Sequence, residues 1–264
     1  MFKGKMKTAA TPERVYALCK IVEAEGIITS SKLKEKMEPS FLSQATVYYG
    51  DYRTAAEELG LIKNEDNMIS LAVDPAVIAT LSSMRGYING RLEQMQDGPF
   101  YKVTKSYFEI GKDIFHKENS ASSLVSEMKN VTGESTLDAD GMRAWRFWAS
   151  FLGFGYLHDM FVIPNAKVFL EDLIFSSELE LEHMYSFGEF IDILRPRCNI
   201  LFPTDVTEKS LNFGVSAGLR ALHDCKEIEL QHILDQQDIW NLCNMPAHAI
   251  KGTVTNITIL GRDT

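Results

Sequence analysis

Cysteine is scarce in this sequence, and its few copies are not arranged as metal ligands or as a disulfide framework. The four cysteines lie far apart among 264 residues, at Cys19, Cys198, Cys225 and Cys243. None belongs to a CxxC pair, and none is followed by a histidine at the spacing of zinc ligands. We therefore expect buried free thiols and no metal site.

The short motifs of common enzyme active sites are also missing. The sequence has no glycine-rich phosphate loop and no HExxH, GxSxG or EF-hand pattern. Asp138 and Asp140 could hold a metal ion, but the helix dipole also favours acids at a helix start, and we prefer that explanation. His223, Asp224 and Cys225 are adjacent, yet neighbours on a helix point in different directions, so no triad follows. We expect no catalysis and no cofactor.

Long apolar runs are absent as well. The longest largely apolar stretch, residues 147–157, is shorter than the roughly 20 residues that a membrane-spanning helix needs. The basic start of the chain, residues 1–7, lacks the apolar segment of a signal peptide. These features predict a cytoplasmic protein that does not bind membranes.

Basic residues are outnumbered by acids, but unevenly along the chain. The formal net charge is −9, yet residues 1–53 carry 9 Lys+Arg against 6 Asp+Glu. The remainder carries 18 against 30, and residues 171–192 contain seven acids and no lysine or arginine. Affinity for DNA comes from lysine and arginine facing phosphates, so only the N-terminal part is suited to it. We expect the acidic C-terminal two-thirds to bind a protein partner or to self-associate.

The first 60 residues show the start and stop signals of three helices. Thr11, followed by proline and glutamate, predicts a helix that ends at Gly26. A second helix starts at residues 29–31 and stops at Pro39, and a third runs from about Ser43 to Leu59. In the third helix, the spacing predicts a buried stripe of Tyr48, Tyr52, Ala55 and Leu59. The same spacing leaves Thr46, Tyr49 and Arg53 exposed.

A β-hairpin follows the third helix directly. Residues 61–63 and 68–73 read as strands around the polar turn 64–67. Three helices followed at once by a hairpin resemble the winged helix-turn-helix superfamily, and the segment LGLIKNEDNMISL carries the resemblance, over residues 12 to about 73. In that superfamily the third helix usually enters the major groove of DNA and the hairpin lies along the backbone.

The resemblance implies two sets of DNA contacts. Nearest the base edges it places Ser43, Gln44, Thr46, Tyr49 and Arg53. Nearest the phosphates it places Lys32, Lys34 and Lys63. The alternative stays open, because many winged helices dock onto proteins and surface lysines are usually just solvated.

The order of elements recurs after a connecting helix expected in residues 74–101. Helices are predicted near 103–115, 122–129 and 138–152, followed by strands around FLGFGYLHDMFVI, so residues 102–165 resemble a second winged-helix-like unit. Its third helix puts Trp145 and Trp148 on one face, which we assign to the core rather than to base stacking. Arg143 and Arg146 on another face are candidates for phosphate or carboxylate contact.

The remaining residues suggest a third unit of helices and strands. Helices are predicted at 187–194 and 211–223, separated by turns at Arg195 and Pro196 and at residues 203–205, and strands at 228–233 and 253–260. We therefore expect a mainly α protein with small β-hairpins, of the α+β class, made of tandem winged-helix-like modules. The expected division is residues 1–75, 76–170 and 171–264.

Two functions follow from these patterns. The first is a non-catalytic DNA-binding regulator, adaptor or accessory subunit, in a setting such as phage defence or DNA modification, where proteins of similar layout occur. The second is a scaffold for protein interactions that uses winged helices without binding DNA. An enzyme with an unfamiliar site is a third, less favoured reading.

Overall fold

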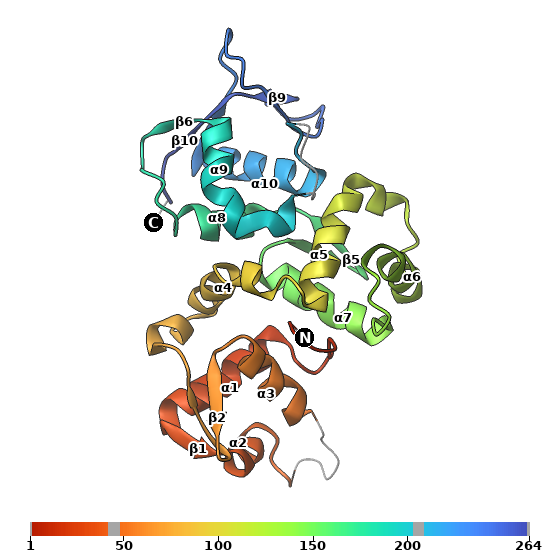
Figure 1. Ribbon diagram of the computed structural model, residues 1–264, viewed down its shortest axis with the longest axis vertical. Coiled ribbons are helices and arrows are strands. Elements are labelled where there is room, and N and C mark those ends of the chain that lie inside the picture. Colours follow the sequence, from red (N-terminus) through yellow and green to blue (C-terminus); the bar gives the residue numbers. More distant parts are fainter. Residues whose placement is uncertain (1, 42–47, 203–208, 263–264) are drawn as a thin grey trace.

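The computed structural model describes residues 2–41, 48–202 and 209–262. Helices make up about 51% of the chain, and the strands form small antiparallel sheets, which confirms the expected α+β class. Three groups of elements succeed one another along the long axis of the molecule: the first at the bottom of Figure 1, the second in the middle and the third at the top. We call them the first, second and third unit.

The first unit combines three helices with a three-stranded sheet. Thr11 and Thr29 accept hydrogen bonds at the starts of its first two helices, as their positions in the sequence predict. The sheet order is β1-β3-β2, so the hairpin gains a third strand that the sequence did not indicate. Its elements are α1 (Pro12–Glu25), β1 (Ile27–Thr29), α2 (Ser30–Met37), α3 (Tyr49–Glu58), β2 (Ile62–Glu65) and β3 (Met68–Leu71).

The third unit repeats this order of elements and this sheet. Its strand order β6-β10-β7 corresponds to β1-β3-β2. The backbone N–H of Ser30 donates to Asn67, just before β3, and that of Phe187 donates to Thr255, just before β10. Its elements are α8 (Lys167–Ile174), β6 (Met184–Ser186), α9 (Phe187–Cys198), η4 (Asn199–Leu201), α10 (Phe213–Asp224), β7 (Ile228–Gln231) and β10 (Asn256–Ile259). Two short strands, β8 (Trp240–Asn241) and β9 (Thr253–Val254), are inserted between β7 and β10.

The second unit has three helices and a two-stranded sheet. Its predicted first helix is interrupted, because Gly111 takes a φ of +57° and the chain continues as a 3-10 helix. The hairpin after the third helix is confirmed. The elements are α5 (Pro99–Ile110), η3 (Gly111–His116), α6 (Ala121–Thr132), α7 (Ala139–Phe151), β4 (Gly155–His158) and β5 (Phe161–Pro164).

The same turn leads from helix to strand in all three units. Gly60, Gly153 and Lys226 have φ values of +68°, +86° and +59°. The residue after each donates its N–H to the carbonyl five positions earlier, as at the end of a helix closed by a left-handed residue. At Gly153 an added Cβ would lie 2.5 Å from the Phe169 nitrogen, so this position requires glycine for space as well as for φ.

The connection between the first two units is α4 (Leu81–Asn89) between two 3-10 turns, η1 (Pro75–Ile78) and η2 (Leu92–Met95), where we expected a single helix. Arg85 on α4 binds Asp172 of α8 through Nε at 2.7 Å and Nη2 at 3.0 Å. Asn89 donates to Asp172 and to the carbonyl of Leu152. Because these side chains are largely buried, α4 joins the second and third units firmly.

Residues 2–10 form an arm that packs on the second unit. The Phe2 side chain is buried, with its ring centroid 5.0 Å from that of Phe100 and 5.1 Å from that of Trp148. The Trp148 indole N–H donates to the carbonyl of Ala10. The arm also passes so close to Gly98 that a Cβ there would lie 1.5 Å from the Phe2 oxygen.

Several side chains lie as predicted and others do not. Trp145 and Trp148 are fully buried, which confirms the core assignment. The turn predicted at Pro196 is wrong, because α9 continues to Cys198 and accommodates proline in its last turn, where only one helical hydrogen bond is lost. The turn predicted at residues 203–205 lies outside the described residues. Cys19 and Cys198 are buried free thiols as expected, whereas Cys225 is exposed and Cys243 half-buried.

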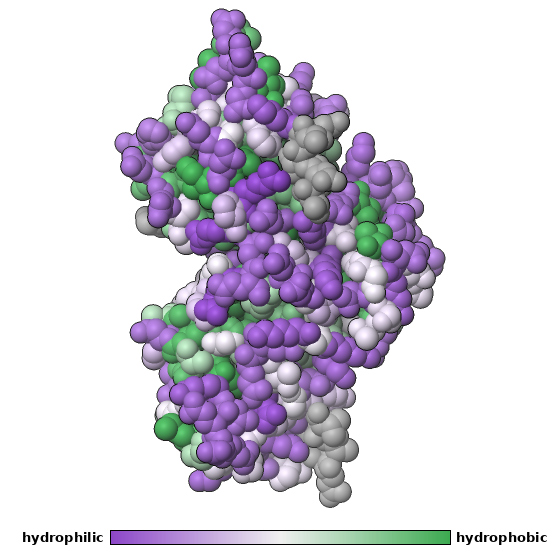
Figure 2. All heavy atoms as spheres, viewed as in Figure 1, coloured by the Kyte–Doolittle hydropathy of each residue, from purple (hydrophilic) through white to green (hydrophobic). Residues whose placement is uncertain are grey.

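Figure 2 shows a mostly hydrophilic face on which apolar residues form separate patches.

Candidate nucleic-acid interface

The third helix of the first unit, α3, presents a narrow exposed face. Gly50 and Thr54 are exposed, while Tyr52, Ala55 and Leu59 are buried as the spacing predicts. Three of the expected base contacts, Ser43, Gln44 and Thr46, lie outside the described residues. The described part of the face is therefore short and offers few groups that could reach a base edge.

Tyr49 was predicted to be exposed and Tyr48 buried, and the structure reverses both. Tyr48 is 50% exposed, whereas Tyr49 is 6% exposed and shares a hydrogen bond of 3.1 Å with the Ser30 hydroxyl. Its ring also meets that of Tyr52 edge-on. The buried stripe therefore keeps Tyr52, Ala55 and Leu59 but begins at Tyr49 instead of Tyr48, because the start of α3 packs against the start of α2. Burial raises the pKa of Tyr49.

Arg53 is only partly available to a ligand. Its Nη1 donates to Ser30 at 3.2 Å, and its Nε lies 3.5 Å from a carboxylate oxygen of Glu57. The guanidinium also lies over the Tyr49 ring, 5.7 Å from its centroid. Contact with a base would require Arg53 to leave these partners, so the structure weakens its assignment to direct base readout.

Lys32 and Lys34 are the most available cations of the predicted set. Both project from α2 and are exposed, and neither has an ion-pair partner within residues 2–41, 48–202 and 209–262. Their neighbour Lys36 differs, since it is bound to Glu25 at 2.8 Å. Lys32 and Lys34 can therefore approach phosphates without first breaking a salt bridge.

The hairpin contributes less positive charge than expected. Lys63 on β2 pairs with Glu65 on the same strand at 3.1 Å. The turn is formed by Asp66 and Asn67, with φ values of +50° and +67°, which these two residue types tolerate. Two acids thus accompany the single lysine at the tip, and this part of the hairpin would repel a phosphate backbone.

The arm adds three lysines, Lys3, Lys5 and Lys7, that are not among the predicted DNA contacts. Glu58, near the end of α3, accepts hydrogen bonds from the backbone N–H groups of Phe2, Lys3 and Gly4, which holds the arm along the helix. A groove of about 190 Å³ lies between the two, lined by Lys5 and Lys7 of the arm and by Asp51, Thr54 and Glu58 of α3. Lysines from positions distant in sequence therefore flank both sides of α3.

Two of these lysines, Lys3 and Lys7, are exposed and have no ion pair with the described residues. Lys5 differs, because its amino group lies 2.6 Å from Asp138 at the start of α7. The hydrogen bond from Lys5 holds the pKa of Asp138 below its ordinary value. Asp138 also accepts from the Gly141 N–H, so it caps α7 as the sequence predicted.

In the second unit, both candidate arginines are engaged within the chain. Arg143 pairs with Asp140 at 2.7 Å, one turn away on α7, and both side chains are largely exposed. Arg146 donates to the carbonyl of Asp159 in the turn of the hairpin and lies over the Phe147 ring. Arg143 can exchange its partner for another anion at low cost, whereas Arg146 fixes the hairpin to α7.

In the third unit, the helix that corresponds to α3 is covered by the chain itself. Most of α10 is buried, including Arg220 with 1% exposure. Arg220 donates to the carbonyls of Ile250 and Lys251, in the segment inserted between β7 and β10. This insertion closes the face of α10 that would otherwise meet a ligand, so the third unit cannot use it for groove contact.

Comparisons with known proteins assign the chain to no family. No protein-family model, curated protein or solved structure matches the chain. Over residues 2–41, 48–202 and 209–262, no cluster of three or more metal-ligating side chains occurs. Within the same ranges, none of the helices has both the length and the apolar character needed to cross a bilayer.

Proposed function

We propose that the protein is a non-enzymatic, DNA-associated adaptor or accessory protein whose first unit is a winged helix-turn-helix. The support lies in the order α1-β1-α2-α3-β2-β3 with the sheet order β1-β3-β2, in which β1 completes the hairpin of a winged helix. The third unit repeats this order, and the second has its three helices and hairpin. The proposed modules are residues 12–73, 99–164 and 167–260.

The observation that carries the proposal is the position of available lysines on both sides of α3. The helix α2, which carries Lys32 and Lys34, meets α3 where Ser30 binds Arg53, while Lys3 and Lys7 lie on the arm, on the side of Thr54 and Glu58. A helix in the major groove has a phosphate backbone on each side. Lysines placed this way can face both strands while α3 lies between them.

Contacts of this kind position a protein on DNA without reading its sequence. Since Tyr49 is buried and Arg53 is bound to Ser30 and Glu57, the described part of α3 offers little for base recognition. We expect weak binding that falls with salt and depends little on sequence. Four phosphate contacts would correspond to a slope of log K against log salt of about −3.6.

Fluorescence anisotropy of the full chain on two unrelated duplexes at low salt tests this proposal. The double variant Lys32→Glu, Lys34→Glu should weaken binding to both duplexes alike and reduce the salt slope. Lys112→Glu with Lys251→Glu, two exposed lysines of the other units without described ion pairs, makes the same change of charge elsewhere. Absence of binding by the unmodified protein at tens of micromolar, or equal loss with both double variants, would contradict the proposal.

The second candidate is a protein-interaction scaffold without DNA binding. It is favoured by the acidic hairpin tip, by the covered α10, and by the exposed apolar residues Tyr156 (56%) and Leu157 (43%) on the hairpin of the second unit. A pull-down with the full chain, in which Tyr156→Ser with Leu157→Ser releases a captured protein while DNA binding is absent, would favour it. Genes neighbouring this one on the chromosome would place either function in a system such as phage defence or DNA modification.

A further inference from the structure

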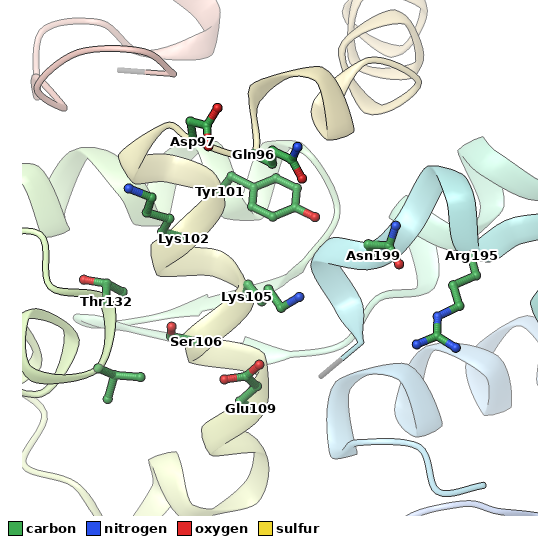
Figure 3. Close-up of a pocket in the computed structure, with 11 residues that line it drawn as sticks. Gln96, Asp97, Tyr101, Lys102, Lys105, Ser106, Glu109, Thr132, Arg195 and Asn199 are labelled. Atoms are coloured by element: carbon green, nitrogen blue, oxygen red, sulfur yellow. The ribbon is translucent and has the colours of Figure 1, made fainter. Parts of the chain in front are cut away.

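A polar groove lies between the second and third units, away from the proposed DNA face. Its volume is about 540 Å³. One wall is α5 with the end of α6, and the other is the last turn of α9 with Asn199, the first residue of η4 (Figure 3). The groove therefore exists only in the assembled chain, where two units meet.

Four side chains in this groove have unused hydrogen-bonding capacity. The Lys105 amino group and the Arg195 guanidinium are half-buried and have no ion pair with any described residue. The Ser106 hydroxyl and the Asn199 amide likewise have no hydrogen bond to residues 2–41, 48–202 or 209–262. Lys102 differs, since it is bound to Glu134 at 2.7 Å. The groove thus offers donors, two of them charged, that the protein itself leaves free.

One carboxylate, that of Glu93, links the two walls of the groove. Glu93 accepts a hydrogen bond of 2.7 Å from the Tyr101 hydroxyl on α5 and one of 3.0 Å from the backbone N–H of Ile200 in η4. Burial, together with this hydrogen bond, raises the pKa of Tyr101, so the tyrosine remains a donor. Because both walls are bound to the same side chain, Lys105 and Arg195 are placed opposite each other before a ligand arrives.

We infer that the groove binds a phosphate group of a small phosphorylated ligand of about nucleotide size. Arg195 can bind phosphate through two N–H groups, Lys105 supplies a second charge from the facing wall, and Asn199 can donate to a remaining oxygen. The volume falls within the usual range of small-molecule sites, roughly 300–1,000 Å³. The mostly polar lining fits a hydrophilic ligand rather than an apolar one.

The acids of the groove restrict what can be bound. Asp97 and Glu109 lie at its opposite ends, with Lys105 between them (Figure 3). Carboxylates there repel a chain of phosphates running through the groove, but they accept hydrogen bonds from the hydroxyl or amino groups of a compact ligand. A free nucleotide satisfies this arrangement, and so does the terminal 5′-phosphate of an oligonucleotide.

Isothermal titration calorimetry of the full chain tests the inference with ATP, AMP, adenosine and inorganic phosphate as probes. A 10-nucleotide single strand with or without a 5′-phosphate distinguishes the two sources of the phosphate. We expect the phosphorylated probes to bind, adenosine not to bind, and Lys105→Ala or Arg195→Ala to weaken binding at least tenfold. Lys112→Ala, an exposed lysine of the second unit outside the groove, should leave the affinity unchanged.

The possible results separate clearly. Binding of AMP or ATP that is lost in the Lys105 and Arg195 variants supports a nucleotide, and binding of the 5′-phosphorylated strand alone, lost in the same variants, supports a nucleic-acid end. No binding at millimolar probe, or binding that the variants leave unchanged, overturns the inference. Circular dichroism confirms folding, and Asn199→Ala is the reserve variant if either substitution unfolds the chain. The variant Lys32→Glu, Lys34→Glu should retain this binding, so the site is tested separately from DNA contact.

Discussion

The rings of Phe2 and Trp148 meet edge to face at a centroid distance of 5.1 Å, which joins the second residue of the chain to a helix 146 positions later. This contact, with Phe100 beside it, fixes the arm that carries Lys3, Lys5 and Lys7. The placement of these lysines beside α3 therefore depends on an aromatic core in another unit.

Replacing Phe2 with alanine should destabilise the protein and release the arm. Loss of a fully buried phenylalanine costs about 3–5 kcal/mol, and the lower end is expected here because a chain end can relax. Urea denaturation measures the loss, and the salt slope of DNA binding should become shallower. Phe41→Ala, at a side chain that is 83% exposed, is the control and should change stability little. Equal stability of both variants would contradict the packing of the arm.

Two glycines should respond to alanine in opposite directions. A Cβ at Gly98 would overlap the Phe2 carbonyl at 1.5 Å, so Gly98→Ala should displace the arm and lower the melting temperature. Gly86 lies inside α4 with open space around it, so Gly86→Ala should stabilise the protein by about 1 kcal/mol. Thermal denaturation of both variants decides the matter, and a stabilising effect at Gly98 would be inconsistent with the close approach.

Removing the charge of Asp172 should be costly. Its side chain is 6% exposed and accepts two hydrogen bonds from Arg85 and one from Asn89. Breaking a buried ion pair on one side typically costs about 3–5 kcal/mol, so Asp172→Ala should lower the free energy of unfolding by a similar amount. Lys63→Ala breaks an exposed pair and should cost less than about 1 kcal/mol. Similar losses in the two variants would argue against the buried junction.

Acid should loosen the arm through Asp138. The folded-state pKa of this carboxyl is lowered by Lys5, so its contribution to stability is complete above the unfolded-state pKa and is lost as the pH falls through the folded value. Asp138→Asn removes this part of the pH dependence. Tryptophan fluorescence from pH 6 to pH 2 follows the acid transition of the unmodified protein and of Asp138→Asn. Identical transitions in the two would exclude Asp138 as a contributor to the pH dependence of stability.

The thiols should differ in reactivity with a disulfide reagent. Cys225 is exposed and should react fast in the native protein, whereas burial raises the pKa of Cys19 to about 12 and that of Cys198 also, so both should react only after unfolding. Counting reacted thiols over time, with Cys225→Ser as the control, tests this. In Cys225→Ser, at most the half-buried Cys243 should react fast. Fast reaction of a further thiol would show that Cys19 or Cys198 becomes accessible in the folded protein.

Much of the secondary structure follows from local signals along the chain. Thr11, Thr29 and Asp138 cap helices where their residue types predict, because a side-chain oxygen near a free N–H acts within one turn. The hairpins after α3 and α7 could be predicted because a Leu-Gly pair ends each helix and strand-forming residues around a polar turn follow it. The equivalent turn at Lys226 lacks the glycine, and the strand β6 is three residues long, so the repetition of the first unit by the third was only weakly indicated.

What the sequence alone determined, then, is the capped starts of several helices, the hairpins after α3 and α7, and the core role of Trp145 and Trp148. Only the tertiary structure decided which polar groups stay free. Tyr49 is buried because α2 covers its side of α3, Arg53 and Arg146 bind groups brought close by packing, and Arg195 faces Lys105 across a groove between two units. Periodicity reports one face of one helix, whereas the partner of a charge depends on contacts between segments far apart in the chain, and no local pattern encodes those.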